Sequence, residues 1–210
     1  LGYNAAVHGQ KSYNGVALLS KTPLEDVQRG LPGDETDEQA RYIEAVVGGP
    51  RPVRVASIYL PNGNPVETEK FGYKLAWMER LKAQARGLLA YEEPLALMGD
   101  YNVIPEARDA ARPQDWVGDA LFQPESREAF RALQWLGLTE AFMAIDGHEG
   151  AYTFWDYQAG AWQKNNGIRI DHALLSPQAA DLLRACVIHK DVRGWEKPSD
   201  HVPVVVELDL

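Results

Sequence analysis

Cysteine is almost missing from this chain of 210 residues, which contains only Cys186. A single cysteine forms no disulfide within the chain and builds no thiolate metal site, and this is typical of a protein in a reducing cytoplasm. Cys186 lies in an apolar run with helix-like spacing, where we expect a core residue rather than a reactive thiol.

Long apolar runs and excess positive charge are missing as well. No run reaches the about 18 apolar residues that a membrane span needs, so we expect no membrane partner. The chain has 21 Lys and Arg residues against 30 Asp and Glu residues, and its net charge is −9. This charge argues against broad adsorption to nucleic acid, but it is compatible with a local basic face and with a metal site that gathers carboxylates.

Hydrophobic periodicity predicts one domain over residues 1–210, without repeats or linkers. Strands are expected at 15–20, 41–47, 53–59, 95–98, 168–175 and 202–208, and an acidic loop at 30–38. Helices are expected at 67–89 and 125–136, and a third begins at Ser176-Pro177 and runs through residue 185. Hairpins mixed with helices indicate an α+β fold in which helices flank a sheet.

Charged residues precede the apolar strand at the end of the chain, in the sequence Pro198-Ser199-Asp200-His201-Val202-Pro203. A buried strand does not need charge at its entrance. A carboxylate binds hard cations and a histidine titrates near neutral pH, so this pair suits a metal site or a proton-transfer site.

Two further polar clusters follow or begin buried strands. Asp100 and Asn102 flank Tyr101 and point the same way in an extended chain, where they either line a site or close an Asx-turn. Asp171 shares one face of its strand with Arg169, and a buried carboxylate requires a partner. That partner is either Arg169 or a histidine from elsewhere, which Asp171 would orient.

Other candidates have two readings each. Tyr59 can donate its hydroxyl to a phosphate or can be an interface aromatic, and Asn62 before Gly63 is most simply a turn residue. Trp155, in the aromatic segment 152–157, suits stacking on nucleotides or a small core under a loop. The remaining candidates either contact phosphate or are simply solvated. They are His8, Lys11 and Arg41.

Seven short motifs occur in an order that is characteristic of one family. They are Tyr3-Asn4, His8-Gly-Gln-Lys11 with residues 15–19, Tyr59-Leu-Pro-Asn62, Gly99-Asp-Tyr-Asn102, Thr153-Phe-Trp-Asp-Tyr157, Gly167-Ile-Arg-Ile-Asp171 and Glu196-Lys-Pro-Ser-Asp-His201. With them the chain resembles the exodeoxyribonuclease III family of class II AP endonucleases, in the endonuclease/exonuclease/phosphatase superfamily. The resemblance implies a four-layer α/β/β/α sandwich of the DNase I type.

The resemblance also implies the chemistry. The expected reaction is Mg²⁺-dependent phosphodiester hydrolysis on the 5′ side of abasic sites, with 3′→5′ exonuclease and 3′-phosphatase activities and with Mn²⁺ as a substitute metal. The expected partner is double-stranded DNA with abasic sites or 3′ ends, bound by a monomer. The location is a bacterial-type cytoplasm with nucleoid-associated activity. Which activity dominates, and whether one or two metal ions act, stays open.

The family pattern assigns roles to individual residues. Asp100 resembles the residue that activates or aligns the attacking water, and Asn102 resembles its partner on the scissile phosphate. Tyr59 resembles the tyrosine near phosphate and metal, and Asp171 the carboxylate that orients the phosphate-contacting His201. The implied metal site uses Asp100, Asn102, Asp200 and His201. The implied DNA-binding residues are Asn62, Trp155, Arg169, Arg41, His8 and Lys11.

One part of the family pattern has no counterpart here. The family opens with a strand that carries an asparagine and a strand that ends in a metal-binding glutamate, whereas this chain resembles the pattern from about 50 residues onward. On that basis we expect an open sandwich edge, weak Mg²⁺ binding and impaired activity for these 210 residues.

Two other functions remain open from the sequence. Another phosphodiesterase or phosphatase of the superfamily, acting on inositol phosphates or sphingomyelin, would share most of the motifs, although residues 152–157 and 196–198 favour the DNA enzyme. A catalytically silent DNA-binding or scaffold module is the second, and the complete set of Tyr59, Asp100, Asn102, Asp171 and His201 argues against it.

Overall fold

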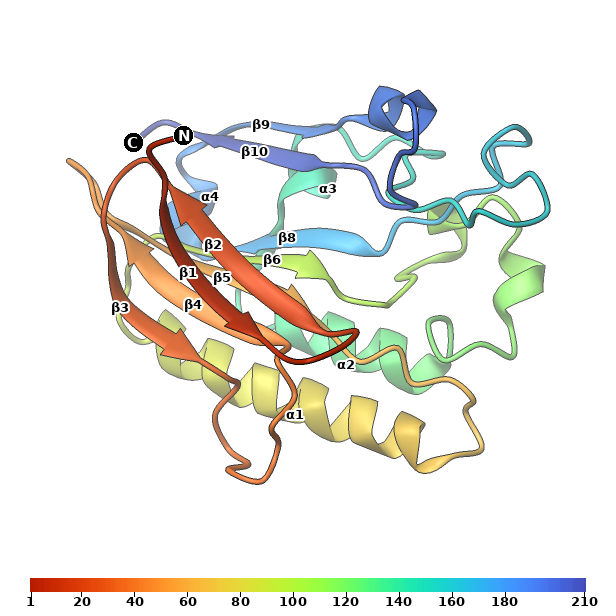
Figure 1. Cartoon of the computed structure of the whole chain (residues 1–210), viewed down its shortest axis with the longest axis horizontal. Helices are drawn as coiled ribbons and strands as arrows, with labels where there is room; N and C mark the ends of the chain where they lie inside the picture. Colours follow the sequence, from red (N-terminus) through yellow and green to blue (C-terminus); the bar gives the residue numbers. More distant parts are fainter.

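A six-stranded mixed sheet forms the centre of the computed structural model, which describes all residues 1–210 (Figure 1). Its strand order is β3-β4-β5-β6-β8-β7, and only β5 and β6 pair in parallel. The strands are β3 (Leu24–Arg29), β4 (Tyr42–Val47), β5 (Val53–Tyr59), β6 (Leu95–Asp100), β7 (Thr139–Glu140) and β8 (Asp171–Leu175).

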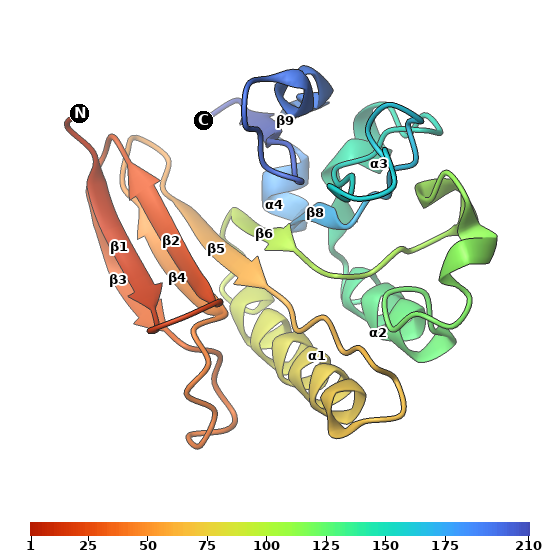
Figure 2. The same cartoon turned by 45° about the vertical axis from the view of Figure 1, so that its right-hand side comes forward.

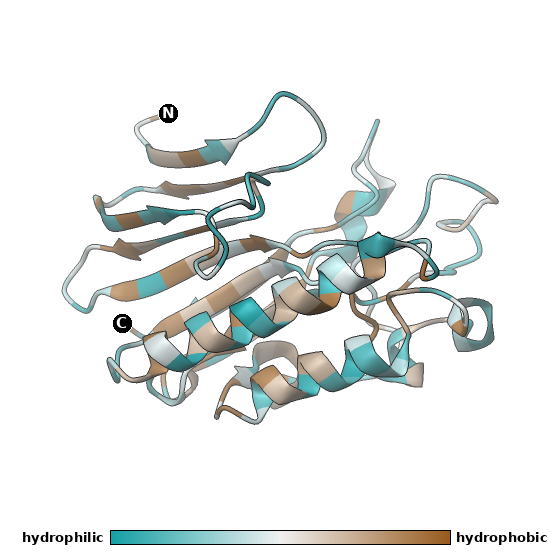
Figure 3. Ribbon diagram, turned by 90° about the horizontal axis from the view of Figure 1, so that it is seen from below, coloured by the Kyte–Doolittle hydropathy of each residue, from teal (hydrophilic) through white to brown (hydrophobic).

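Two helices cover one face of this sheet, α1 (Glu69–Leu89) and α2 (Pro124–Gln134) (Figure 2). Thr68 caps α1, and its apolar residues recur at helical spacing, so that one side packs on the sheet. Figure 3 shows such hydrophobic positions among hydrophilic ones along both helices. Trp77, Leu81 and Phe130 are almost fully buried here, and each such side chain contributes about 1.5–3 kcal/mol by its burial.

Two separate hairpins cover the opposite face (Figures 1 and 2). One consists of β1 (Asn4–Gly9) and β2 (Gly15–Ser20), the other of β9 (Leu183–Ile188) and β10 (Val204–Leu208). Between them lies an open trough of about 440 Å³ whose lining includes Leu18, Val55, Met98 and Val204. The short helices are α3 (Ala141–Ile145) and α4 (Pro177–Ala180), with 3₁₀ turns at Ala107–Asp109, Pro113–Trp116 and Lys190–Gly194.

Most predicted elements are present, and the differences have local causes. The strand at 15–20 and the strand at 53–59 are confirmed with the same bounds. The helix that begins at Ser176 ends at Ala180, so its predicted extension through residue 185 is wrong. Residues 183–188 instead pair with β10, and Cys186 is a buried residue of that strand rather than of a helix.

No helix of the structure has the length and apolar character that crossing a membrane requires.

The close approach of β5 and β6 depends on a glycine beside the end of β6. Gly99 has a φ of 144°, and a Cβ atom there would lie 2.0 Å from the carbonyl oxygen of Ile58. Only glycine avoids this overlap, so Gly99 sets the spacing of the two strands next to Asp100.

We predict that Gly99→Ala destabilises the fold by about 3 kcal/mol or more, because the overlapping atoms are backbone atoms that cannot move aside alone. Gly87→Ala is the matched control, since Gly87 lies in α1 with open space around its Cα. The control should gain about 0.5–1 kcal/mol of stability. Urea unfolding of both variants measures the difference, and equal midpoints would contradict the argument.

Candidate active site

Strand pairing brings three polar residues together at one edge of the sheet. Tyr59 ends β5 and pairs with Asp100, which ends β6. Asp100 in turn pairs with Asp171, the first residue of β8. A tyrosine and two carboxylates from distant parts of the sequence therefore lie side by side.

His201 completes this group from the loop before β10. Its Nδ1 donates to both carboxylate oxygens of Asp171, at 3.1 and 2.9 Å. The ring of Phe154 lies edge-on to the imidazole, with 5.0 Å between the ring centroids. Of the two partners expected for Asp171, the structure contains the histidine, and Nε2 is the imidazole nitrogen left for a substrate.

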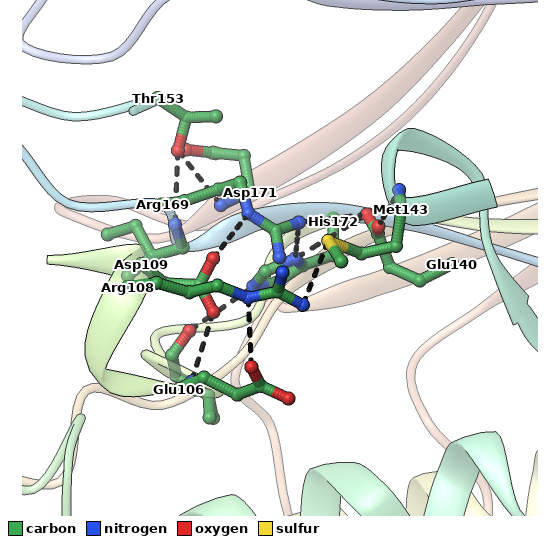
Figure 4. A network of polar contacts seen from close by, with 11 residues as sticks. Glu106, Arg108, Asp109, Glu140, Met143, Thr153, Arg169, Asp171 and His172 are labelled. Carbon is green, nitrogen blue, oxygen red and sulfur yellow. Dashed lines mark hydrogen bonds and ion pairs between the residues drawn. The ribbon is translucent and has the colours of Figure 1, made fainter. Parts of the chain in front are cut away.

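The backbone of Asp171 is held by a buried hydroxyl. Oγ1 of Thr153 accepts hydrogen bonds from the amides of Ile170 and Asp171, each at 3.1 Å (Figure 4). These amides have no strand partner where β8 begins, so Thr153 satisfies them and fixes the direction in which Asp171 leaves the sheet.

Asp100 and Asn102 form a tight local turn. The Asp100 carboxylate accepts from the backbone amide of Asn102 at 2.8 Å and from its side-chain Nδ2 at 3.0 Å. The same Nδ2 donates to the carbonyl of Leu60 at 2.9 Å, so both hydrogens of the amide are used inside the protein. Asn62 donates to Oδ1 of Asn102 at 3.2 Å, which links the loops after β5 and β6. The Asx-turn expected as an alternative is thus present, and it orients the carboxylate.

The electrostatics of the group are unusual. Burial, and next the neighbouring charge of Asp171, raise the pKa of Asp100 to about 7. Burial alone would lower the pKa of His201. The hydrogen bond to Asp171 and the negative charges of Asp171, Asp100 and Asp200 outweigh burial and raise this pKa to about 9. At neutral pH the imidazole therefore carries a proton, while Asp100 is close to its titration midpoint.

The strand ends around Asp100 suit a metal ion that keeps open coordination positions for water and substrate. Asp100 and Asp171 repel each other, and a cation would relieve that repulsion. No group of three or more acidic, histidine or cysteine side chains converges on a single point. Mg²⁺ is commonly held by one or two carboxylates together with waters and substrate phosphates, and the residues present suit that mode rather than a closed cage.

The remaining predicted residues lie along the rim beside Tyr59. The guanidinium of Arg41 lies 4.9 Å from the Tyr59 ring centroid and donates to the Tyr59 carbonyl at 3.2 Å. The turn of the β1–β2 hairpin joins the same segment, because Gln10 accepts from the amide of Ala40 at 2.9 Å. His8 and Lys11 belong to this hairpin and are half-buried and exposed, respectively.

Two expected DNA-binding residues are instead buried. Trp155 has no exposed surface, packs edge-on to Trp162 and donates from Nε1 to Asn165 at 3.3 Å. Its ring cannot stack on a base in this conformation, and the alternative reading of a small core under the loop is the one the structure contains. The partly exposed Phe154 faces His201 in its place.

Arg169 is buried as well, with 3% of its surface exposed. Its guanidinium binds Asp109 at 2.9 Å, Glu140 at 3.1 Å and Nδ1 of His172 at 3.1 Å (Figure 4). The expected DNA contact of Arg169 is therefore not possible here. This ion-pair network joins the 3₁₀ turn Ala107–Asp109 to β7 and β8 and supports the segment that carries Asp171.

Sequence reasoning missed three contributors, namely Phe154, the Arg169 network and Lys74. Lys74 lies in α1 without exposed surface and donates from Nζ to the carbonyls of Asn62 and Asn102. Its helical spacing with Trp77, Met78 and Leu81 was the available signal, because it places a lysine in the buried stripe of the helix.

We predict that the imidazole of His201 titrates near pH 9 in the metal-free protein, and that Asp171→Asn lowers this pKa toward the ordinary 6.5. The folded pKa lies above the unfolded one, so the pair stabilises the fold fully below pH 6.5, and this stability is lost as pH rises through 9. NMR titration of the ring signals measures it, with Asp200→Asn as a milder control. An unchanged titration in Asp171→Asn would contradict the assignment.

A second prediction concerns the cost of the Asp100 charge. Its pKa rises from 3.8 to about 7 on folding. The ionised carboxylate therefore destabilises the fold above neutral pH, whereas below about pH 4 the carboxyl group is protonated and has no such cost. Asp100→Asn should therefore shift the thermal midpoint more favourably at pH 8 than at pH 4. Identical shifts at the two pH values, measured by circular dichroism, would show that the charge has no such cost.

The chain is similar to known nucleases over nearly its full length. Residues 1–201 match the model of the endonuclease/exonuclease/phosphatase family. Exodeoxyribonuclease III of Haemophilus influenzae is 32% identical, and the alignment covers 99% of this chain and 81% of that protein.

Solved structures agree in three dimensions. A 3′ phosphatase from Neisseria, bound to a product DNA hairpin, is 36% identical to this chain and superimposes with a TM-score of 0.95. The superposition covers 100% of this chain and 80% of the Neisseria chain. An AP endonuclease from Archaeoglobus fulgidus has a TM-score of 0.93 and 34% identity, with the same coverages. The expected α+β, DNase I-like fold is confirmed, and the chain belongs to the endonuclease/exonuclease/phosphatase family, within its exodeoxyribonuclease III and AP endonuclease branch.

Proposed function

We propose that this chain is a DNA repair nuclease that hydrolyses phosphodiester bonds 5′ to abasic sites and at the 3′ ends of double-stranded DNA. The observation that carries the proposal is the pairing of His201 with Asp171 beside the buried Asp100–Asn102 turn. The named activities of its relatives, an exodeoxyribonuclease, an AP endonuclease and a 3′ phosphatase, support the same choice.

In this proposal His201 binds the scissile phosphate. Its Nδ1–H is held by Asp171, so Nε2–H points away from that pair and can donate to a non-bridging oxygen. Because the pKa of His201 is raised to about 9, the ring is an imidazolium at neutral pH. A charged donor of fixed direction stabilises the extra negative charge that develops on the phosphate.

Asp100 acts on the water that attacks. The Asn102 turn fixes the direction of its carboxylate, which can accept a proton from this water. Asn102 uses both hydrogens of its amide inside the protein, so we assign it the orientation of Asp100 rather than direct phosphate binding. Tyr59 lies next to Asp100 in the sheet register, and its hydroxyl is the second donor to the phosphate.

The family consists of nucleases that depend on a divalent metal ion. We propose Mg²⁺, with Mn²⁺ as a substitute, held by Asp100 and Asp200 with Asn102 nearby. When bound, this ion would supply positive charge to the phosphate oxygens and orient them.

The test is a single-turnover assay on a duplex oligonucleotide that contains one abasic site, with Mg²⁺ and with a chelator. Labelling of either strand end separates one incision from an exonuclease ladder. In line with the weak Mg²⁺ binding expected from the sequence, we expect a slow, metal-dependent incision that leaves an extendable 3′-hydroxyl. Its rate should fall by a further factor of about 10² or more in Asp100→Asn and in His201→Asn.

Tyr91→Ser is the matched control, since Tyr91 is 63% exposed and lies in the turn between α1 and β6, at the opposite end of β6 from Asp100. Its rate should equal that of the unmodified chain. The proposal fails if the unmodified chain makes no incision with either metal, or if Asp100→Asn cleaves as fast as the control.

A further inference from the structure

A lysine occupies the buried side of α1 and reaches the two loops that carry Asn62 and Asn102. Lys74 begins the buried stripe of the helix, which continues through Trp77, Met78 and Leu81. Lysine is almost never fully buried unless its ammonium group finds partners, because removal from water penalises the charge. The position therefore calls for a reason other than core packing.

The partners of Lys74 are two carbonyl groups in two different loops. Its Nζ donates to the carbonyl of Asn102 at 2.6 Å and to that of Asn62 at 3.1 Å. Asn62 follows β5 and Asn102 follows β6, where the backbone is irregular and offers no strand partner. Asn102 has a φ of 47°, a left-handed conformation that asparagine adopts more readily than most other residues with a side chain.

The stem of Lys74 also shapes the first of these loops. Gly63 has a φ of 90°, and a Cβ atom there would lie 2.6 Å from Cδ of Lys74 and 3.2 Å from Cβ of Ala120. The loop after β5 is thus packed against the methylene chain of Lys74, while its carbonyl is bound by the ammonium group at the end. One side chain fixes the loop both by contact and by hydrogen bonding.

The same two loops carry the polar side chains of the site. Asn62 donates to Asn102 at 3.2 Å, and Asn102 donates to Asp100 at 3.0 Å. Lys74 is at the other side of these peptides, away from solvent, and so cannot touch a substrate itself.

We propose that Lys74 is a positioning residue, which locks the Asn62 loop to the Asn102 loop and thereby holds Asp100 in the direction that water activation requires. The proposal rests on the nuclease function proposed above. A carboxylate displaced by about 1 Å from its reacting position costs about 10²-fold in rate, so the lock affects turnover more than substrate binding.

Lys74→Met tests this, because methionine keeps the length of the stem but has no donor. Leu88→Ala is the matched control, since Leu88 belongs to the same buried stripe at the far end of α1. The first readout needs no activity: NMR of the side-chain amides of Asn62 and Asn102, assigned by their loss in Asn62→Ser and Asn102→Ser. We expect at least about tenfold faster solvent exchange of these amides in Lys74→Met and no change in Leu88→Ala.

The second readout is incision of abasic duplex DNA by the same proteins. Lys74→Met should lower kcat about 10²-fold with KM changed less than about threefold, whereas Leu88→Ala should lower only stability. Unchanged amide exchange, or changed exchange with an unchanged kcat, would overturn the proposal. If Lys74→Met does not fold, Lys74→Gln serves, because its shorter amide cannot reach both carbonyls.

The two proposals can fail separately. A chain that cleaves no DNA in any form overturns the proposed function, while the amide exchange still decides whether Lys74 locks the loops. Normal cleavage by Lys74→Met overturns the positioning role and leaves the nuclease function intact.

Discussion

The pairing of β6 with β8 places the carboxylates of Asp100 and Asp171 next to each other, where β6 ends and β8 begins. Burial, and next the charge of Asp171, raise the pKa of Asp100, because like charges at such a position cannot both ionise freely. Neighbouring groups offset this repulsion by charge and by hydrogen bonding. His201 neutralises Asp171, the Asn102 turn holds Asp100 through two hydrogen bonds, and Lys74 lies beneath.

This arrangement explains why the site draws on segments far apart in the chain. Each acid ends or begins a strand of the central sheet, but its partner comes from an irregular segment, with His201 before β10 and Thr153 in the aromatic loop. Irregular backbone has no strand partners of its own, and buried side chains supply them. The ammonium group of Lys74 binds carbonyls of two such loops, and the Arg169 network fixes the segment before β8 through ion pairs.

Local sequence predicted what depends on local rules and failed where a distant segment decides. The period of apolar residues was sufficient for α1, and the motif order for the residues around Asp100 and His201. Local sequence did not predict β3, whose mostly polar residues pair across a bulge. It also missed β9, because pairing with β10 replaces the predicted extension of the helix that begins at Ser176. The DNA contact expected for Trp155 was wrong because its ring packs against Trp162 in a small buried cluster, and Trp162 lies outside the aromatic segment 152–157. The helical spacing of Lys74 with Trp77 and Leu81 places it in the buried stripe of α1, but only the position of the two loops shows what its ammonium group binds.

The charge count of the site bears on the order of events with a phosphodiester. Asp100, Asp171 and Asp200 stand against His201 and Lys74, and burial disfavours the charge on Lys74. Arg41 beside Tyr59 adds a third cation, so with every group ionised the charges balance and an anionic phosphate gains little by approaching alone. A divalent cation would make the net charge positive and would lower the pKa of Asp100, because it favours the ionised carboxylate. In the proposed reaction the cation would therefore bind before or with the phosphate, and His201 would contribute direction as well as charge.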